Sequence, residues 1–318
     1  MKHTATAVLG LSRFIKCRTV CPKRTTLLLL LAASAVFAAD DAYRAQIEKD
    51  RRDTDEFLRS PRSPLLLVGR FSVNEGVSTL GSDPASTIIL PAKAPPHVGT
   101  LIRHGDQFTF QPVAGTSVSR NDQPISGSVT LQVTEPPKPT DRIAFGDFKF
   151  GIRPLNNEFA LLLSDAQSPF LKGFTGTTWF PIDLAYRVTA QFTPAPQQKT
   201  VLVPYTDGGE KTYMVRGDLV FQLAGQSFRL QALASPGGKG LFIMFQDQTS
   251  GRETYGGGRF IEAETPENGK TTLDFNKASN PYCADDPYAV CPVPLKQNRL
   301  AVPIHAGEKH NGLEAAAH

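Results

Sequence analysis

Apolar and polar residues alternate over short stretches along most of the chain, and turn-forming residues separate these stretches. Across Leu65–Pro154 the pattern repeats in short segments, as strands do in an antiparallel β-sandwich at a spacing of about 8–12 residues. The alternation returns after Pro181. It is clearest in Asp218–Ala232, where Ala224-Gly225-Gln226 predicts a hairpin turn. The pattern predicts a mainly β protein with two successive β units.

One stretch before the β segments lacks this alternation. Ala42–Ser60 is polar with widely spaced apolar residues, which predicts a surface helix that stops at Pro61 and Pro64. The predicted parts are a signal peptide over residues 1–38, a short N-terminal helix over 39–62, a β-sandwich over 63–157, a connector over 158–180, an antiparallel β domain over 181–309 and a flexible tail over 310–318.

The first part has the pattern of an export signal. Leu27–Ala39 is an apolar run of 13 residues that follows Lys23 and Arg24, and it ends in small residues. Cleavage is expected after Ala38. An uncleaved membrane anchor is the alternative, but the run is shorter than the roughly 20 residues that span a bilayer. We expect an exported protein, periplasmic or extracellular, with no membrane span after cleavage.

Composition and charge restrict the possible fold and the possible binding partners. The chain has 26 Gly and 25 Pro, which suits short strands joined by tight turns. Its net charge is +4, but residues 1–38 hold six basic residues and no acidic one, so the remainder carries a net charge of −2. This balance gives no electrostatic basis for binding nucleic acid.

The second β unit contains three distinctive strings. They are FPIDLAYRV from Phe180, FQDQTSGRETYGGGRF from Phe245, and LDFNKASNPYCADDPYAVCPVPLKQNRLAVPIHAGEK from Leu273. With them, residues 181–309 resemble the DUF1684 family, a domain of unknown function. The resemblance therefore implies a relationship in fold and no particular reaction. Ser279, Tyr282 and His305 depart from the family's usual residues, which indicates that these positions are adaptable.

The first β unit resembles a degenerate forkhead-associated (FHA) domain. The resemblance rests on Gly81-Ser82-Asp83, Pro96-His97-Val98-Gly99 and Ser119-Arg120-Asn121-Asp122, which occur in that family's order. Such domains bind phosphothreonine through an Arg after the first Gly and a Ser before the His. Here Ser82 and Pro96 occupy those positions, so the Arg that favours phosphate recognition is missing.

Polar residues in the second unit form the candidate site. The segment from Asp247 to Arg259 contains Thr249 and Gly251 in a turn-forming pattern, and Glu253 and Tyr255 would share one face of a strand. This segment is either a polar hairpin tip, with a salt bridge such as Glu253–Arg259, or part of a ligand pocket. The full candidate pocket comprises Asp247, Thr249, Glu253, Tyr255, Arg259, Asp274, Asn276, Asn280, Asn298, Arg299 and Glu308.

Cys283 and Cys291 are the two cysteines that follow the leader. In an oxidising compartment a disulfide is the simplest interpretation, and a metal site or a reactive thiol are the alternatives. Zinc sites usually have two to four residues between paired cysteines, whereas seven residues separate Cys283 and Cys291. We expect no metal and no cofactor.

The leading functional hypothesis is a non-catalytic module that binds a small ligand or a protein. Motifs of nucleophilic or metal-dependent hydrolases do not occur in the sequence. The first alternative is a hydrolase-like or metal-assisted enzyme that gathers Asp247, Glu253, Arg259, Asp274 and Asn276 in one pocket. The second is a phosphopeptide-binding FHA module.

Overall fold

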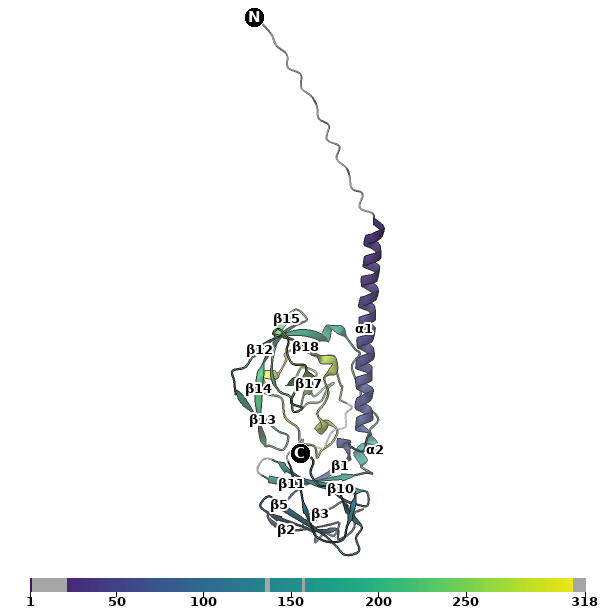
Figure 1. The fold of residues 1–318 in the computed structure, drawn as a ribbon, viewed down its shortest axis with the longest axis vertical. Coiled ribbons are helices and arrows are strands. Elements are labelled where there is room, and N and C mark those ends of the chain that lie inside the picture. Colours follow the sequence, from purple (N-terminus) through teal and green to yellow (C-terminus); the bar gives the residue numbers. More distant parts are fainter. Residues whose placement is uncertain (2–21, 135–137, 156–157, 311–318) are drawn as a thin grey trace. The chain divides into compact units, whose positions relative to one another are not determined.

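The computed structural model describes Met1 and residues 22–134, 138–155 and 158–310, with side chains described from Ala39 onward. The chain forms two units, Met1–Gln46 and Ile47–His318, and helix α1 (Pro22–Leu58) contributes to both (Figure 1). The side chains of the predicted signal peptide, residues 1–38, lie outside the described part. So does the predicted tail, apart from His310. Among the described residues, no helix has both the length and the apolarity needed to cross a membrane.

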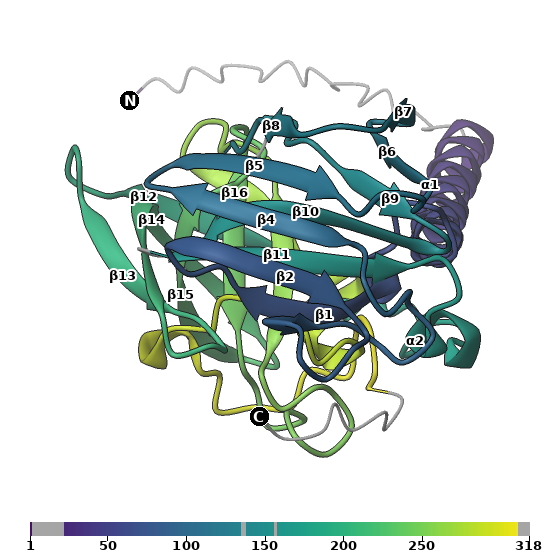
Figure 2. The ribbon, with the colours of Figure 1, turned by 90° about the horizontal axis from the view of Figure 1, so that it is seen from below.

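The first β unit is a sandwich of two sheets, as the alternation predicts. One sheet has the strand order β1 (Leu67–Ser72), β11 (Glu158–Asp165), β10 (Phe148–Leu155), β9 (Ile143–Phe145), β6 (Val118–Arg120) and β7 (Gln123–Ile125). The other has the order β3 (Ile88–Ile89), β2 (Gly76–Gly81), β4 (Gly99–His104), β5 (Gln107–Pro112) and β8 (Val129–Leu131). Figure 2 shows β2, β4 and β5 side by side in one layer.

Aromatic and aliphatic side chains from both sheets fill the sandwich. Phe110 of β5 packs edge-on against Phe150 of β10 with 5.5 Å between ring centroids, and both rings are fully buried. Leu101 and Leu163 join the same core from opposite sheets. Burial of this apolar surface is the main stabilising contribution to the sandwich.

Strand β11 differs from the sequence prediction, which placed Glu158 in a connector. The structure forms a strand over Glu158–Asp165 and pairs it with both β10 and β1. Leu161 and Leu163 face the core, while Leu162 faces the opposite side of the sheet. Three consecutive leucines hide the two-residue period, because the outward position is apolar as well.

The second β unit is built on one antiparallel sheet. Its strand order is β17 (Arg259–Ala263), β16 (Leu241–Phe245), β15 (Gln226–Ala234), β14 (Glu210–Leu223), β12 (Arg187–Pro194) and β18 (Lys270–Asp274), and β13 (Thr200–Pro204) also pairs with β14. The β14–β15 hairpin is the predicted one. Leu223 pairs with Gln226 across Ala224 and Gly225, which both have positive φ, as a two-residue turn requires.

Short helical turns complete the fold. They are η1 (Pro64–Leu66), α2 (Pro169–Gly173), η2 (Leu184–Tyr186), η3 (Phe275–Lys277), η4 (Tyr282–Ala284) and η5 (Lys296–Asn298). The end of α1 and η1 pack on α2, with Leu58, Leu65 and Phe174 forming a small apolar cluster. The structure confirms the mainly β class and the N-terminal helix.

Candidate functional site

Arg259 and Asp247 form a fully buried ion pair inside the second β unit. Asp247 follows β16 and Arg259 begins β17, and these two strands are paired. Nη2 of Arg259 lies 2.7 Å from Oδ2 of Asp247, and neither side chain is exposed to solvent. Burial lowers the pKa of Arg259, and the nearby carboxylate of Asp247 opposes this shift. The predicted partner of Arg259 was Glu253, but Glu253 lies at the surface beside His305 instead.

The ion pair fastens a distant part of the chain to the sheet. Arg259 donates to the backbone carbonyls of Ile304, Ala306 and Glu308. Asp247 Oδ1 accepts from the amide of Ile304 at 3.2 Å and from the amide and hydroxyl of Thr249 at 2.7 and 2.6 Å. These bonds direct the two side chains toward backbone rather than toward an open cavity, so their role is to hold residues 304–308 in place.

Glu308 and Asn280 form a second buried contact close to this pair. The exposed fraction of Glu308 is 6%, and its Oε2 accepts from the amide of Asn280 at 2.8 Å. Asn280 Nδ2 donates to the carbonyl of Lys309 at 2.9 Å. Desolvation raises the pKa of Glu308 to about 8, so this carboxyl group is largely protonated at neutral pH.

Cys283 and Cys291 are free thiols in the structure, rather than the predicted disulfide. The amide of Cys283 donates to Sγ of Cys291 at 3.4 Å, and the hydroxyl of Tyr255 donates to Sγ of Cys283 at 3.7 Å. The hydrogen bond between the thiols lowers the pKa of Cys283 and raises that of Cys291. The two cysteines therefore contact each other as thiols, and the backbone amide of Cys291 donates to Thr206 Oγ1.

The remaining predicted residues lie in two other networks. Asp274 caps η3 by accepting from the amide of Asn276, and Asn276 bonds in turn to both backbone groups of Asp183. Asn298 links strands β15 and β16, because it accepts from the amide of Gln231 and donates to the carbonyls of Gln231 and Met244. Arg299 is exposed and pairs with Gln246 through its backbone.

The predicted pocket is thus divided into separate structural networks. Asp247, Thr249 and Arg259 come together, and Asn280 and Glu308 lie next to them. Asp274 and Asn276 bond to each other, and Asn276 and Asn298 join backbone groups that are distant in the sequence. In the part of the chain that the structure describes, no three His, Cys, Asp or Glu side chains gather as a metal site would require.

The FHA-like positions are also occupied by internal bonds. Ser82 Oγ donates to the carbonyl of Ala94 at 2.7 Å, and exposed His97 lies 3.7 Å from Asp83. A Cβ at Gly81 would come within 1.8 Å of the Pro96 carbonyl oxygen, which explains why glycine is needed there. Ser82 and His97 therefore act in the turn itself.

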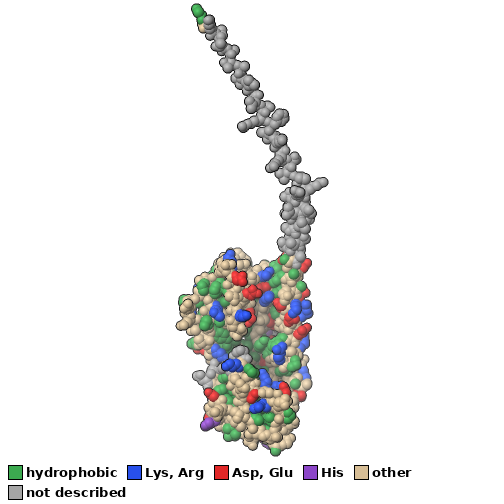
Figure 3. All heavy atoms as spheres, viewed as in Figure 1, with side chains coloured by type: hydrophobic (Ala, Val, Ile, Leu, Met, Phe, Trp, Pro, Cys, Tyr) green, Lys and Arg blue, Asp and Glu red, His purple; other side chains and the backbone are tan. Residues whose placement is uncertain are grey.

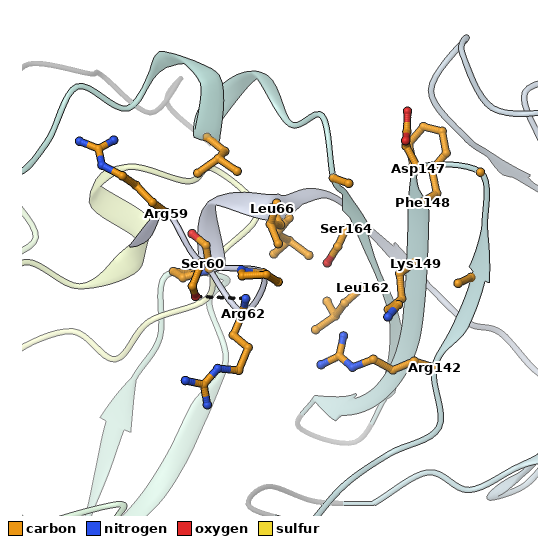
Figure 4. A pocket seen from close by; sticks show the side chains of 18 of the residues that line it. Arg59, Ser60, Arg62, Leu66, Arg142, Asp147, Phe148, Lys149, Leu162 and Ser164 are labelled. Carbon is orange, nitrogen blue, oxygen red and sulfur yellow. Dashed lines mark hydrogen bonds between the residues drawn. The ribbon is translucent and has the colours of Figure 1, made fainter. Parts of the chain in front are cut away.

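A large groove lies on the outer face of the sandwich sheet that contains β9, β10 and β11 (Figure 4). Its volume is about 1020 Å³. We call it the sheet-face groove and define it by Arg62, Leu66, Arg142, Lys149, Leu162 and Ser164. None of the residues in the predicted pocket lines it.

Strand register explains why these side chains share one face. Lys149 of β10 is paired with Ser164 of β11, and Leu162 lies two residues before Ser164 on the same face. Arg142 lies two residues before Ala144, which is paired with Lys149. The segment between α1 and β1 supplies the opposite wall, where Arg62 follows Ser60 and donates its amide to the Ser60 hydroxyl (Figure 4).

Basic side chains predominate in the groove. Its lining includes four basic and two acidic side chains, a net charge of +2. Arg59 donates to the carbonyl of Phe174, and Lys149 lies 3.4 Å from Asp122. Within the described ranges, the guanidinium groups of Arg62 and Arg142 form no ion pair and no hydrogen bond. Elsewhere, on the face drawn in Figure 3, basic and acidic side chains are intermixed.

Comparison with known proteins identifies the second β unit. The family model described as "Protein of unknown function (DUF1684)" matches residues 172–309. The chain belongs to this family. The DUF1684 match begins ahead of the expected domain start at Pro181 and includes Lys172 and Gly173, the last two residues of α2. No curated protein matches the sequence.

Two solved structures resemble parts of this DUF1684 protein. One is the solution structure of an uncharacterized protein of Haloarcula marismortui, with 32% identity over 43% of this chain and 78% of that chain, and a TM-score of 0.37. The other is the FhaA FHA domain, solved in complex with the intracellular domain of Rv3910, with 13% identity over 29% of this chain and 85% of that chain, and a TM-score of 0.21. Neither comparison assigns an activity.

Proposed function

We propose that this DUF1684 protein is exported and acts as a non-catalytic binding module that holds its ligand in the sheet-face groove. The groove carries the proposal. Its volume of about 1020 Å³ is at the upper end of the range typical of ligand-binding sites, roughly 300–1,000 Å³. Leu66 and Leu162 give it apolar surface, and Arg62 and Arg142 place polar groups around that surface.

The polar residues of the second β unit support a binding role over an enzymatic one. Catalysis by a general acid or base needs a side chain within hydrogen-bond reach of a substrate. Asp247 and Arg259 instead use their polar atoms on each other and on backbone groups of residues 304–308. Glu308 is directed to the amide of Asn280.

The leader supports export. The apolar run of Leu27–Ala39 after Lys23 and Arg24 has the order of a secretory signal, and removal of residues 1–38 leaves a body with a net charge of −2. An intact mass of the protein from the exported fraction tests this part. A mass that begins at Ala39 is expected, and a full-length chain found only in cells would contradict export.

Binding in the groove can be tested with 8-anilinonaphthalene-1-sulfonate, a dye that is both apolar and anionic. Its fluorescence should rise on binding to the purified protein. Ala144→Trp should abolish the rise, because Ala144 lines the groove and a tryptophan would fill it. Thr189→Trp is the matched control, since Thr189 is an exposed strand residue of β12 outside the groove. Equal fluorescence in both variants would show that the dye binds elsewhere.

A further inference from the structure

We infer that the ligand of the sheet-face groove is an extended acidic peptide segment of a partner protein, held by Arg62 and Arg142. This inference rests on the proposed function and specifies its ligand class. Arg62 and Arg142 lie on opposite walls of the groove, and Leu66 and Leu162 line the same two walls (Figure 4). An occupant that contacts both walls must therefore present negative charge at two separated points and apolar groups as well.

Charge complementarity favours an acidic occupant. The groove lining has a net charge of +2, whereas the body after residue 38 has a net charge of −2. The concentration of positive charge is therefore local to the groove. A guanidinium presents several donors in a fixed plane and binds carboxylates through paired hydrogen bonds. Arg62 and Arg142 have no such partner in the described chain, so both are available to a ligand.

The shape of the groove favours a peptide over a small anion. A single carboxylate would contact one arginine and leave most of the 1020 Å³ unfilled. In an extended peptide, side chains alternate between two directions, so acidic and apolar residues can face different parts of one groove. The polar Ser60 and Ser164 add hydrogen-bonding groups along the walls, which a peptide backbone can use.

This site is separate from the positions that the FHA resemblance implicates. Ser82 and His97 lie at the turns next to β2 and β4, and neither lines the sheet-face groove. Arg62 precedes the sandwich and Arg142 directly precedes β9. The inferred peptide site therefore depends on residues outside the FHA-like motif.

The test measures fluorescence anisotropy with a labelled nine-residue peptide of alternating glutamate and leucine. The purified protein should bind this peptide and should not bind the same peptide with lysine in place of glutamate. Raising the salt from 50 to 500 mM should weaken binding, because screening shortens the reach of exposed charges. Arg62→Gln and Arg142→Gln should each weaken it about tenfold. Arg252→Gln, at an exposed arginine outside the groove, is the matched control.

Reversing the charge of Arg142 tests directly whether this side chain selects the acidic peptide. Arg142→Glu should lose the acidic peptide and gain measurable binding of the lysine peptide, and unchanged urea unfolding would show that the variant is folded. Equal binding of both peptides by the unmodified protein would overturn the inference. So would groove binding of dodecanoate with no binding of the acidic peptide, because the occupant would then be an amphiphile. Dye binding that is blocked by Ala144→Trp, without peptide binding, would leave the proposed function standing and remove only the peptide.

Discussion

The buried carboxylate of Asp247 can be removed to test how the second β unit is held together. In Asp247→Ala, the guanidinium of Arg259 would keep its charge and its fully buried position but lose the carboxylate 2.7 Å away. The amides of Thr249 and Ile304 would lose an acceptor at the same time. The variant therefore combines an uncompensated buried charge with unpaired backbone donors.

The expected loss is large. Breaking a buried ion pair by removing one partner costs about 3–5 kcal/mol, and a folded domain has a total stability of only about 5–15 kcal/mol. The exposed pair of Glu253 and His305 gives the matched control, because their side chains are 47% and 48% exposed. Glu253→Ala should change the free energy of unfolding by less than about 1 kcal/mol.

Urea unfolding followed by Trp179 fluorescence measures both variants. Trp179 is the only tryptophan, and its backbone pairs with Glu308 in the segment that Arg259 holds. In the double variant Asp247→Leu/Arg259→Met, the loss should be smaller than the sum of the two single losses, because no unpaired charge remains. A loss below about 1 kcal/mol for Asp247→Ala would refute the reasoning, since solvent would then be reaching Arg259.

Three further predictions concern other buried groups. Burial raises the pKa of Glu308 from 4.5 to about 8, so the folded state keeps a proton that the unfolded state releases. Its contribution to stability is therefore full below about pH 4.5 and is lost as the pH rises toward 8. Urea unfolding at several pH values should show that Glu308→Gln reduces the dependence of the free energy of unfolding on pH. An unchanged dependence would assign it to other groups. Asn298→Ala should lower the free energy of unfolding by about 1–3 kcal/mol or more, because backbone groups of Gln231 and Met244 lose partners; a change near zero would mean that water replaces the amide. Cys283 and Cys291 should resist iodoacetamide in the native, reduced protein and react after denaturation, as read by mass, and rapid native labelling would contradict their burial.

Much of the fold follows from the sequence because the strands are short and carry local signals. The period-two alternation located most strands, and Ala224 and Gly225 marked the hairpin between β14 and β15. Strand β11 was not predicted, because Leu161, Leu162 and Leu163 are all apolar although they face alternate sides of the sheet. Leu162 faces the groove rather than open solvent, so the strand has no alternation of apolar and polar residues by which it could be recognised.

The site was predicted less well, since proximity in space depends on long-range pairing. The chemistry of Asp247, Thr249 and Arg259 pointed to a polar cluster, and the structure does bring these residues together. Their partners at Ile304 and Glu308 are 45 to 57 residues away in the sequence, and no local pattern predicts contacts over that separation. The sheet-face groove has no motif at all, because Arg62 and Arg142 belong to segments that meet only in the folded chain.

The dependence of Arg259 on residues 304–308 has a consequence for the order in which the chain becomes structured during synthesis. A ribosome produces Arg259 well before its carbonyl acceptors, which follow 45 to 49 residues later. Until they emerge, burying the guanidinium would leave most of its donors without acceptors, which is costly in a low-dielectric interior. The second β unit should therefore delay its final compaction until this stretch has been translated, which keeps the growing chain open when most of its strands already exist.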